Sequence, residues 1–456
     1  MNFSKTIGSS ALLLASCASL PLAAQQTEDA SSARCDIRTF GAIAGDGLPD
    51  TAAIQAAVAA CEGVGGTVVI PQGEWSTGTV RLGSNMTLLL EQEAVLALHP
   101  DIDLFPEMPV SRDNGSAMVR AALLADGVEA LRIEGAGRIE GNGEAFWDDS
   151  FYESGLRRPT LPRPGPVIEL ANCSDTHVSG ISMTNMPAYA IRYHRCDGVS
   201  ATGITIRNDP RSPNTDGIQL RDTSNAVIRG VDIRTGDDAI VLKSGDRIVD
   251  NILVENSYLE SDDAALKFGT GSREGVTNSV FRNIEIRNSR YGIALFMIDG
   301  GTHANNLFEN IVISTGGRNS RQFPIFLDID RREADRSLGR IVDTTFRNLA
   351  IETSGASLIA GNPDAPIEGL ILRNIVLTIR DPFDVTVRSA KPRGNINIEG
   401  QSGSVDYSTA NAHFAFGHID GLSLGAINIA VGDDGGHDDG GRQDFFLQDV
   451  TLTLQN

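Results

Sequence analysis

The chain has 456 residues and carries 38 lysines and arginines against 59 aspartates and glutamates, a formal net charge of −21. This balance argues against a nucleic-acid partner, because phosphate binding needs a basic surface. It also matches an acidic polysaccharide poorly as a whole, so such a substrate would require a locally basic cleft.

The first residues are typical of an export signal. Lys5 precedes the apolar run Ala11–Ala15, which is too short to span a bilayer as a helix. Two processing sites compete, a lipoprotein box ending at Cys17 and an ordinary cleavage site after Ala24. No later segment reaches the ~20 apolar residues that a membrane span requires.

We therefore expect residues 1–24 to be a signal peptide, of lipoprotein type if cleavage falls before Cys17. Residues 25–456 are expected to form one domain, which would be periplasmic, lipid-anchored to the outer membrane or secreted. We expect this domain to act as a monomer.

The segment from Arg38 to Ala97 is expected to close one end of the fold. Asp50 or Thr51 starts a pattern typical of a capped amphipathic helix that runs to Val58. A helix here would cover the edge of the first strands, which would otherwise invite aggregation. Further on, the proline- and arginine-rich stretch 154–164 is expected to be a long surface loop.

From about residue 170 onward, short β-branched strands end in Asn or Thr turns, as in Ile181–Asn185, Ile204–Asn208 and Ile252–Asn256. Such units begin 21 to 38 residues apart, and a second strand series lies between them. Alternation of period two indicates strands, and the unit spacing indicates one coil per repeat. A β-propeller would need repeats nearer ~40 residues. The sequence thus predicts an all-β, right-handed parallel β-helix with a short N-terminal capping helix.

Apart from Cys17, the chain has Cys35, Cys61, Cys173 and Cys196, an even count that permits two disulfides in an oxidising compartment. Cys173 and Cys196 lie about one coil apart. They could therefore be bonded neighbours or two buried free thiols.

Two segments, Asn214–Gly217 and Gly236–Ala239, place three carboxylates within one coil. Asp216 and Asp238 each precede an alternating strand by two residues, so stacked strands would put both in one column at ~4.8 Å spacing, with Asp237 in the adjoining turn. Like charges at short range raise at least one pKa. Hydrolysis of a glycosidic bond needs one protonated and one ionised carboxyl group, so a catalytic role in that reaction fits these three aspartates. The alternative is that their side chains cap the turns in which they lie.

These residues resemble glycoside hydrolase family 28, the polygalacturonase-like enzymes. The resemblance also takes in Asp50–Gln55, Val68–Pro71 and Lys243–Gly245. It implies that Asp237 is the general acid, that Asp216 and Asp238 activate water, and that the reaction inverts the anomeric centre. Asn214 and Lys243 are expected to contact the substrate.

The family's next motifs differ here. The register set by Phe268–Thr270 puts Ala264 where the family has a histidine, and Ala294–Phe296 replaces the Arg-Ile-Lys that grips the substrate carboxylate. A lost charge-assisted contact forfeits ~1.5–3 kcal/mol. Ordinary polygalacturonate is therefore expected to be a poor substrate, with a decorated, branched or chemically different glycoside preferred.

The coils that follow offer other side chains as substrate contacts. In the register set by Phe268–Thr270, Asp263 lies over Asp237 and Arg290 over Asp263. A slip by one residue would place Asp263 over Asp238 instead, and the sequence leaves both registers open. Lys267 and Arg290 could replace the lost cations, or they could form an ionic ladder on a solvated face.

Tyr291 could stack on a sugar ring or pack on the surface. His194 and His303 are each expected to be structural. The acidic tract Asp433–Asp439 resembles a calcium loop but lacks the ligand spacing, so a solvated loop is expected.

We therefore expect an exported glycosidase that cleaves a uronic-acid-containing poly- or oligosaccharide without cofactor or metal. One alternative is a β-helix polysaccharide lyase with Lys267 as base and Ca²⁺ held by Asp237, Asp238, Asp262 and Asp263. A carbohydrate-binding β-helix with a degenerate site is the other.

Overall fold

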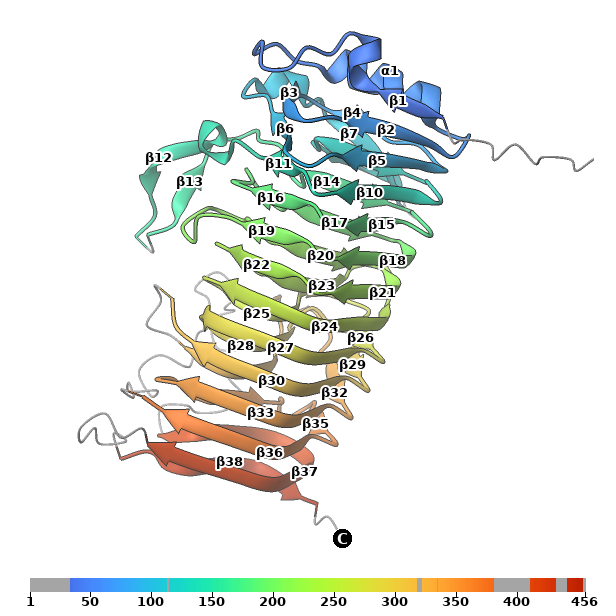
Figure 1. The fold of residues 1–456 in the computed structure, drawn as a ribbon. Helices are drawn as coiled ribbons and strands as arrows, with labels where there is room; N and C mark the ends of the chain where they lie inside the picture. Colours follow the sequence, from blue (N-terminus) through green and yellow to red (C-terminus); the bar gives the residue numbers. More distant parts are fainter. Residues whose placement is uncertain are drawn as a thin grey trace, which may run out of the picture. The chain divides into compact units, whose positions relative to one another are not determined.

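The computed structural model describes residues 33–112, 115–153, 155–317, 322–333, 335–380, 411–431 and 441–453, all within one compact unit, Ala33–Asn456. Successive coils of short parallel strands stack so that each strand pairs with its counterparts in the coils before and after it (Figure 1). The prediction of a right-handed parallel β-helix is confirmed. The predicted export signal with Cys17 and the acidic tract Asp433–Asp439 both lie outside the described residues.

Each coil contributes strands to three walls, defined here by the pairings. Wall A consists of β4 (Val80–Arg81), β9 (Leu123–Asp126), β14 (Ile168–Ala171), β17 (Ile191–His194), β20 (Ile218–Arg221), β23 (Ile240–Ser244), β25 (Ala264–Ser272), β28 (Tyr291–Met297), β31 (Phe323–Ile329) and β34 (Ser357–Ala360). The long strand β37 (Ala412–Val431) pairs with strands of all three walls, and β38 (Gln443–Leu452) pairs with β37.

Wall B consists of β1 (Arg34–Asp36), β2 (Gly66–Ile70), β5 (Met86–Leu90), β10 (Leu131–Gly135), β15 (His177–Ser179), β18 (Asp197–Thr202), β21 (Ser224–Arg229), β26 (Val276–Thr277), β29 (Thr302–Ala304), β32 (Arg340–Val342) and β35 (Ile367–Glu368). Wall C consists of β3 (Gly73–Thr77), β6 (Ala94–Leu98), β11 (Arg138–Glu140), β16 (Ser182–Thr184), β19 (Thr205–Arg207) and β22 (Asp232–Thr235). Long strands then join walls B and C: β24 (Val249–Ser261), β27 (Val280–Ser289), β30 (Leu307–Thr315), β33 (Thr345–Thr353) and β36 (Ile371–Ile379).

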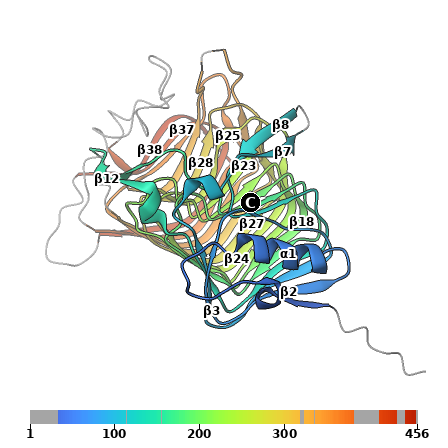
Figure 2. The same ribbon diagram turned by 90° about the horizontal axis from the view of Figure 1, so that it is seen from above.

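The predicted capping helix is present as α1 (Thr51–Cys61), at the N-terminal end of the coil stack (Figure 2). Asp50 does not cap it with its side chain; the carboxylate instead accepts hydrogen bonds from the backbone N–H groups of Ile43 and Ser76, at 2.9 and 3.0 Å. A disulfide between Cys35 and Cys61 ties β1 to the end of the helix.

Cys173 and Cys196 are buried free thiols, which resolves the alternative that the sequence left open. Of the four cysteines in the described residues, only Cys35 and Cys61 are therefore bonded to each other.

Two repeating features hold the coils in register. Inside the helix, the rings of Phe281, Phe308 and Phe346 stack with centroids 4.7 and 4.9 Å apart. On the outside, a ladder of asparagines with positive φ joins successive turns through side-chain amide bonds: Asn256, Asn283, Asn310, Asn348 and Asn374. Asparagine tolerates this left-handed backbone better than most residues, which explains the Asn turns in the repeat.

Two antiparallel hairpins leave the coils: β7 (Met108–Arg112) with β8 (Gly115–Val119), and β12 (Trp147–Phe151) with β13 (Arg157–Pro159). The expected surface loop 154–164 thus contains a strand. Its Arg157 N–H donates to the carbonyl of Arg211 at 2.8 Å, which holds it beside the loop after β19. Three 3₁₀ turns complete the elements, η1 (Ile37–Phe40), η2 (Ile102–Leu104) and η3 (Gly143–Phe146). In the described residues, no helix is long and apolar enough to cross a membrane.

Candidate active site

The two carboxylate segments lie at the starts of β20 and β23 in wall A. The register Ile218↔Ile240 places Asp216 and Asp238 in one column, and the Gly217 N–H donates to the Asp238 carbonyl at 2.8 Å. A Cβ atom on Gly217 would lie 2.5 Å from the Ala239 carbonyl oxygen, so the turn needs glycine there. The predicted stacking of Asp216 and Asp238 is confirmed.

Asp216 is a buried carboxylate, 3% exposed. Its Oδ2 accepts a hydrogen bond from Gln219 Nε2 at 3.4 Å and lies 3.8 Å from Lys243 Nζ. Burial, and then the charge of Asp237, raise the pKa of Asp216 to about 6 against the opposing pull of Lys243 and Lys267. This group therefore titrates near neutrality.

Asp237 lies at the corner between walls C and A and is the most exposed of the three carboxylates. Its Oδ2 accepts from Asn214 Nδ2 at 3.4 Å, and its Oδ1 accepts from the Asp238 N–H at 2.9 Å. Asn214 is itself held by Arg163, whose Nη2 donates to Asn214 Oδ1 at 2.9 Å. The expected position of Asn214 beside the carboxylates is thus observed, and its contact with substrate stays a prediction.

Asp238 forms the shortest ion pair of the site. Lys267 Nζ lies 2.9 and 2.8 Å from the two carboxylate oxygens of Asp238 and 3.2 Å from Asp263 Oδ2. Lys267 is only 2% exposed. Burial alone would lower the pKa of this lysine, but Asp238 and then Asp237 outweigh it and raise the pKa above its ordinary value.

The structure decides between the two registers that the sequence left open. Ile240 pairs with Leu266 and Leu266 with Ile293, so Asp263 lies over Asp237 and Arg290 over Asp263. Arg290 Nη1 lies 3.2 Å from Asp263 Oδ1.

The expectation that Lys267 belongs to an ionic ladder on a solvated face is wrong, because this lysine is buried among carboxylates. For the same reason Lys267 faces Asp238 and Asp263 rather than an open cleft. Arg290 and Asp263 pair with each other, and their contact with substrate stays a prediction.

Tyr291 does not lie on the surface, so both expectations for it are wrong. Its ring is fully buried and stacks on Phe323 with centroids 5.1 Å apart. It belongs to an apolar group that we call the sealed cluster, whose members are at most 2% exposed: Ala264, Tyr291, Ala294, Phe296, Phe323, Phe326, Ala356, Leu358, Ala360 and Ala415. The position of the family's histidine and both positions of its cationic residues thus lie in this cluster.

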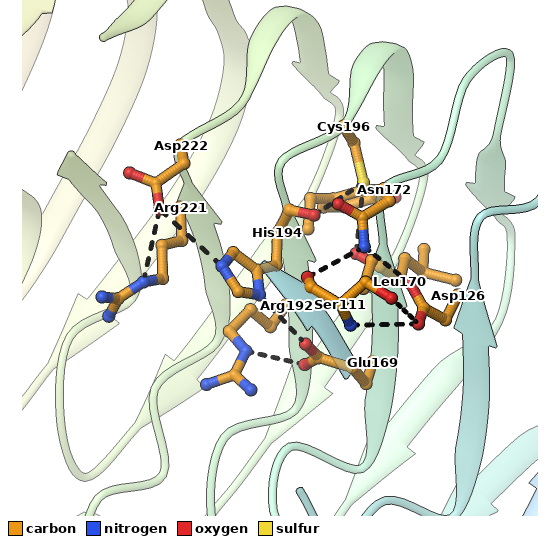
Figure 3. Close-up of polar contacts among 12 residues, drawn as sticks. Ser111, Asp126, Glu169, Leu170, Asn172, Arg192, His194, Cys196, Arg221 and Asp222 are labelled. Carbon is orange, nitrogen blue, oxygen red and sulfur yellow. Dashed lines mark hydrogen bonds and ion pairs between the residues drawn. The ribbon is translucent and has the colours of Figure 1, made fainter. Parts of the chain in front are cut away.

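The two histidines near the site are both buried. His194 lies between Glu169 and Asp222, with nitrogen–oxygen distances of 3.6 and 3.7 Å, and Arg192 Nε donates to Glu169 at 2.6 Å (Figure 3). Burial lowers the pKa of His303 to about 3, and its Nδ1 accepts from the Val276 N–H at 3.0 Å. Both therefore serve the packing of the coils, as expected.

Three residues of the site were missed in the sequence. Tyr189 precedes Asp216 by one coil, and the charge of Asp216, then burial, raise the pKa of this tyrosine to about 12. The offset of one coil from Asp216 could have identified Tyr189. Gln219 could have been found because it is the outward-facing position between Ile218 and Leu220. Arg163 comes from a non-repeating loop, so no periodic signal marks it.

A separate cavity of about 480 Å³ lies beside this site and is lined by Arg207, Arg234, Glu260, Asp262 and neighbouring residues. It includes none of Asp216, Asp237 and Asp238. Within the described residues, the carboxylates close enough to share an ion are Asp237, Asp238 and Asp263, with oxygens within 4.8 Å of one another, and Asp262 does not join them.

Comparison with known proteins agrees with this geometry. The model of "Glycosyl hydrolases family 28" matches residues 71–389, more than half of the chain. A "Probable polygalacturonase" of Vitis vinifera is 32% identical over 219 residues, 45% of this chain and 43% of that protein. "Polygalacturonase QRT2" of Arabidopsis thaliana is 25% identical over 60% of this chain and 64% of its own length. The chain thus spans about half to two thirds of these relatives.

Among solved structures, the family 28 exopolygalacturonase of Yersinia enterocolitica aligns with a TM-score of 0.71. It covers 92% of this chain and 78% of its own, at 17% identity. At that identity the match supports the fold alone.

Proposed function

Because this chain belongs to the glycosyl hydrolases family 28, we propose that it is an exported hydrolase of a uronic-acid-containing, pectin-type glycan. The observation that carries the proposal is the stacking of Asp216 and Asp238 in one column, with the more exposed Asp237 in the adjoining corner. Named relatives that are polygalacturonases support a galacturonate-containing substrate.

We assign to the three carboxyl groups the roles that the family resemblance implies. Asp237 donates its proton to the glycosidic oxygen as the carbon–oxygen bond breaks. Asp216 and Asp238 hold a water molecule and accept its proton as its oxygen bonds to the anomeric carbon, with inversion. The ion pair with Lys267 keeps Asp238 ionised, so we assign to Asp238 the role of the base that accepts the proton of the water molecule.

The lyase alternative fits these contacts less well. A lyase would need a neutral Lys267 as base and a Ca²⁺ ion between the carboxylates. The raised pKa of Lys267 keeps its ammonium protonated, and that ammonium already bridges Asp238 and Asp263. The presence of all three aspartates, Asp216, Asp237 and Asp238, also favours an enzyme over a binding protein with a degenerate site.

The test is a product screen on homogalacturonan, rhamnogalacturonan and other uronic-acid glycans. We expect new reducing ends without ultraviolet-absorbing unsaturated product, no loss of activity with chelator, and inverted anomers in fresh product by NMR. Unsaturated product that disappears with chelator would favour the lyase. If no glycan is cleaved, the carbohydrate-binding protein with a degenerate site would be the remaining alternative.

Export is supported by the signal-like N-terminus and by the Cys35–Cys61 disulfide, which is typical of oxidising compartments. We propose a monomer whose anchoring depends on Cys17. A Cys17→Ser variant should lose membrane association in fractionated cells if the lipoprotein site is used, and size-exclusion chromatography reports the oligomeric state.

A further inference from the structure

The outward face of wall A changes from polar to apolar side chains near the three carboxylates. Outward positions stack in register along the column Arg192–Gln219–Val241–Lys267–Ala294–Phe326. The members before Lys267 are mostly polar or charged, and those after it are apolar. The change occurs within one coil of the catalytic aspartates.

On the C-terminal side of Asp238, the sealed cluster occupies the outward face. Ala264 pairs with Tyr291 and Tyr291 with Phe323, so the column that contains Asp216 and Asp238 continues directly into buried side chains. A sugar can reach these positions only by displacing packed aromatic rings. Further sugar units therefore find no exposed polar groups at the positions of the sealed cluster. In the adjoining corner Arg290 and Asp263, 12% and 13% exposed, are paired with each other.

On the N-terminal side, cations remain partly exposed. Lys243 lies 5.9 Å from the ring centroid of Tyr189, and the exposed side-chain fractions of Arg192 and Arg221 are 12% and 29%. Arg192 is fixed by Glu169, and Arg221 Nε lies 3.6 Å from Asp222 (Figure 3). Cations held in place in this way suit the carboxylates of a uronic-acid chain, because little side-chain entropy is lost on binding.

We propose that the glycan binds only over the coils on the N-terminal side of the catalytic aspartates, so that the enzyme cleaves bonds near one chain end. This inference rests on the proposed function. It assigns the carboxylate contacts to Arg192, Arg221 and Lys243, on the opposite side of the aspartates from the family's Arg-Ile-Lys positions.

The product pattern tests the mode of cleavage. The probe is a reducing-end-labelled hexasaccharide of the panel glycan that is cleaved fastest, hexagalacturonate for homogalacturonan. We expect early products of one short size, with the label wholly in the short piece or wholly in the long one. Label spread over all product sizes would overturn the inference, while failure to cleave any panel glycan would contradict the proposed function instead.

A variant tests the assigned contacts. Arg221→Gln should raise KM roughly ten- to a hundredfold, the effect of losing one charge-assisted contact, while kcat changes little. Arg340→Gln is the matched control, because Arg340 is a 56% exposed wall B arginine paired with Glu368. Arg221→Lys, with a thermal unfolding curve, separates lost binding from lost folding. An unchanged KM in folded Arg221→Gln would contradict the assignment.

Discussion

The ammonium of Lys267 lies where two buried carboxylates, Asp238 and Asp263, would otherwise repel each other. Removing it leaves Asp238 uncompensated, so the pKa of Asp238 should rise and its ionised fraction at neutral pH should fall. We predict that Lys267→Met lowers kcat roughly 10²- to 10⁴-fold and moves the acid limb of the pH profile upward. Lys267→Arg should retain the position of that limb. A pH–rate profile with the same acid limb in folded Lys267→Met would exclude this role.

The buried carboxylate of Asp216 gives a second prediction, which concerns the free energy of unfolding. Its pKa is raised in the folded protein, so its ionisation opposes folding. The cost is absent below its unfolded pKa near 3.8 and fully present above about 6. Asp216→Asn should therefore be inactive yet more stable than wild type at pH 7, by about 2–3 kcal/mol, and this gain should vanish near pH 3.5. Urea denaturation at both pH values measures it; equal stability at pH 7 would contradict it.

At the scale of the elements, the asparagine ladder should hold the turns between coils. Asn310 has φ 54° and bonds through its side chain to Asn283 at 3.2 Å and Asn348 at 2.9 Å. Asn310→Ala should lose both bonds and strain the backbone, destabilising by about 2–4 kcal/mol. Asn310→Gly keeps the backbone and should cost less. Denaturant midpoints measure both, and equal losses would show that backbone strain contributes nothing.

Some features of the strands and loops could be predicted from the sequence, and others could not. Strand alternation and coil spacing are local signals, and they placed Asp216 over Asp238 correctly. They left open whether Asp263 lies over Asp237 or over Asp238. Burial of Lys267 and Tyr291 depends on what packs against the outside of wall A, which no period in the sequence encodes. Arg163 reaches the site from a non-repeating loop, and the Cys35–Cys61 pair depends on how α1 packs on β1.

For the whole molecule, the charge of −21 and the proposed one-sided binding together bear on how a polymer is used. An acidic polymer is repelled by most of the surface, and in the proposed binding mode only a chain end reaches the aspartates. We predict that short oligogalacturonates are cleaved faster than homogalacturonan at equal uronate mass, which gives a physical reason for the expected poor activity on the polymer. Rates of reducing-end release on both substrates measure this. A faster rate on the polymer would contradict it.

Asp237 is proposed as the general acid of the glycosidic hydrolysis. Its most direct test compares Asp237→Asn with Asp262→Asn, which replaces a carboxylate one coil later that lies outside the catalytic group. Both proteins should show the wild-type unfolding transition. We predict that reducing-end release from the best panel glycan is abolished in Asp237→Asn and retained in Asp262→Asn, because the acid and its water-activating partners act as a unit. Full activity of folded Asp237→Asn would exclude Asp237 as the general acid.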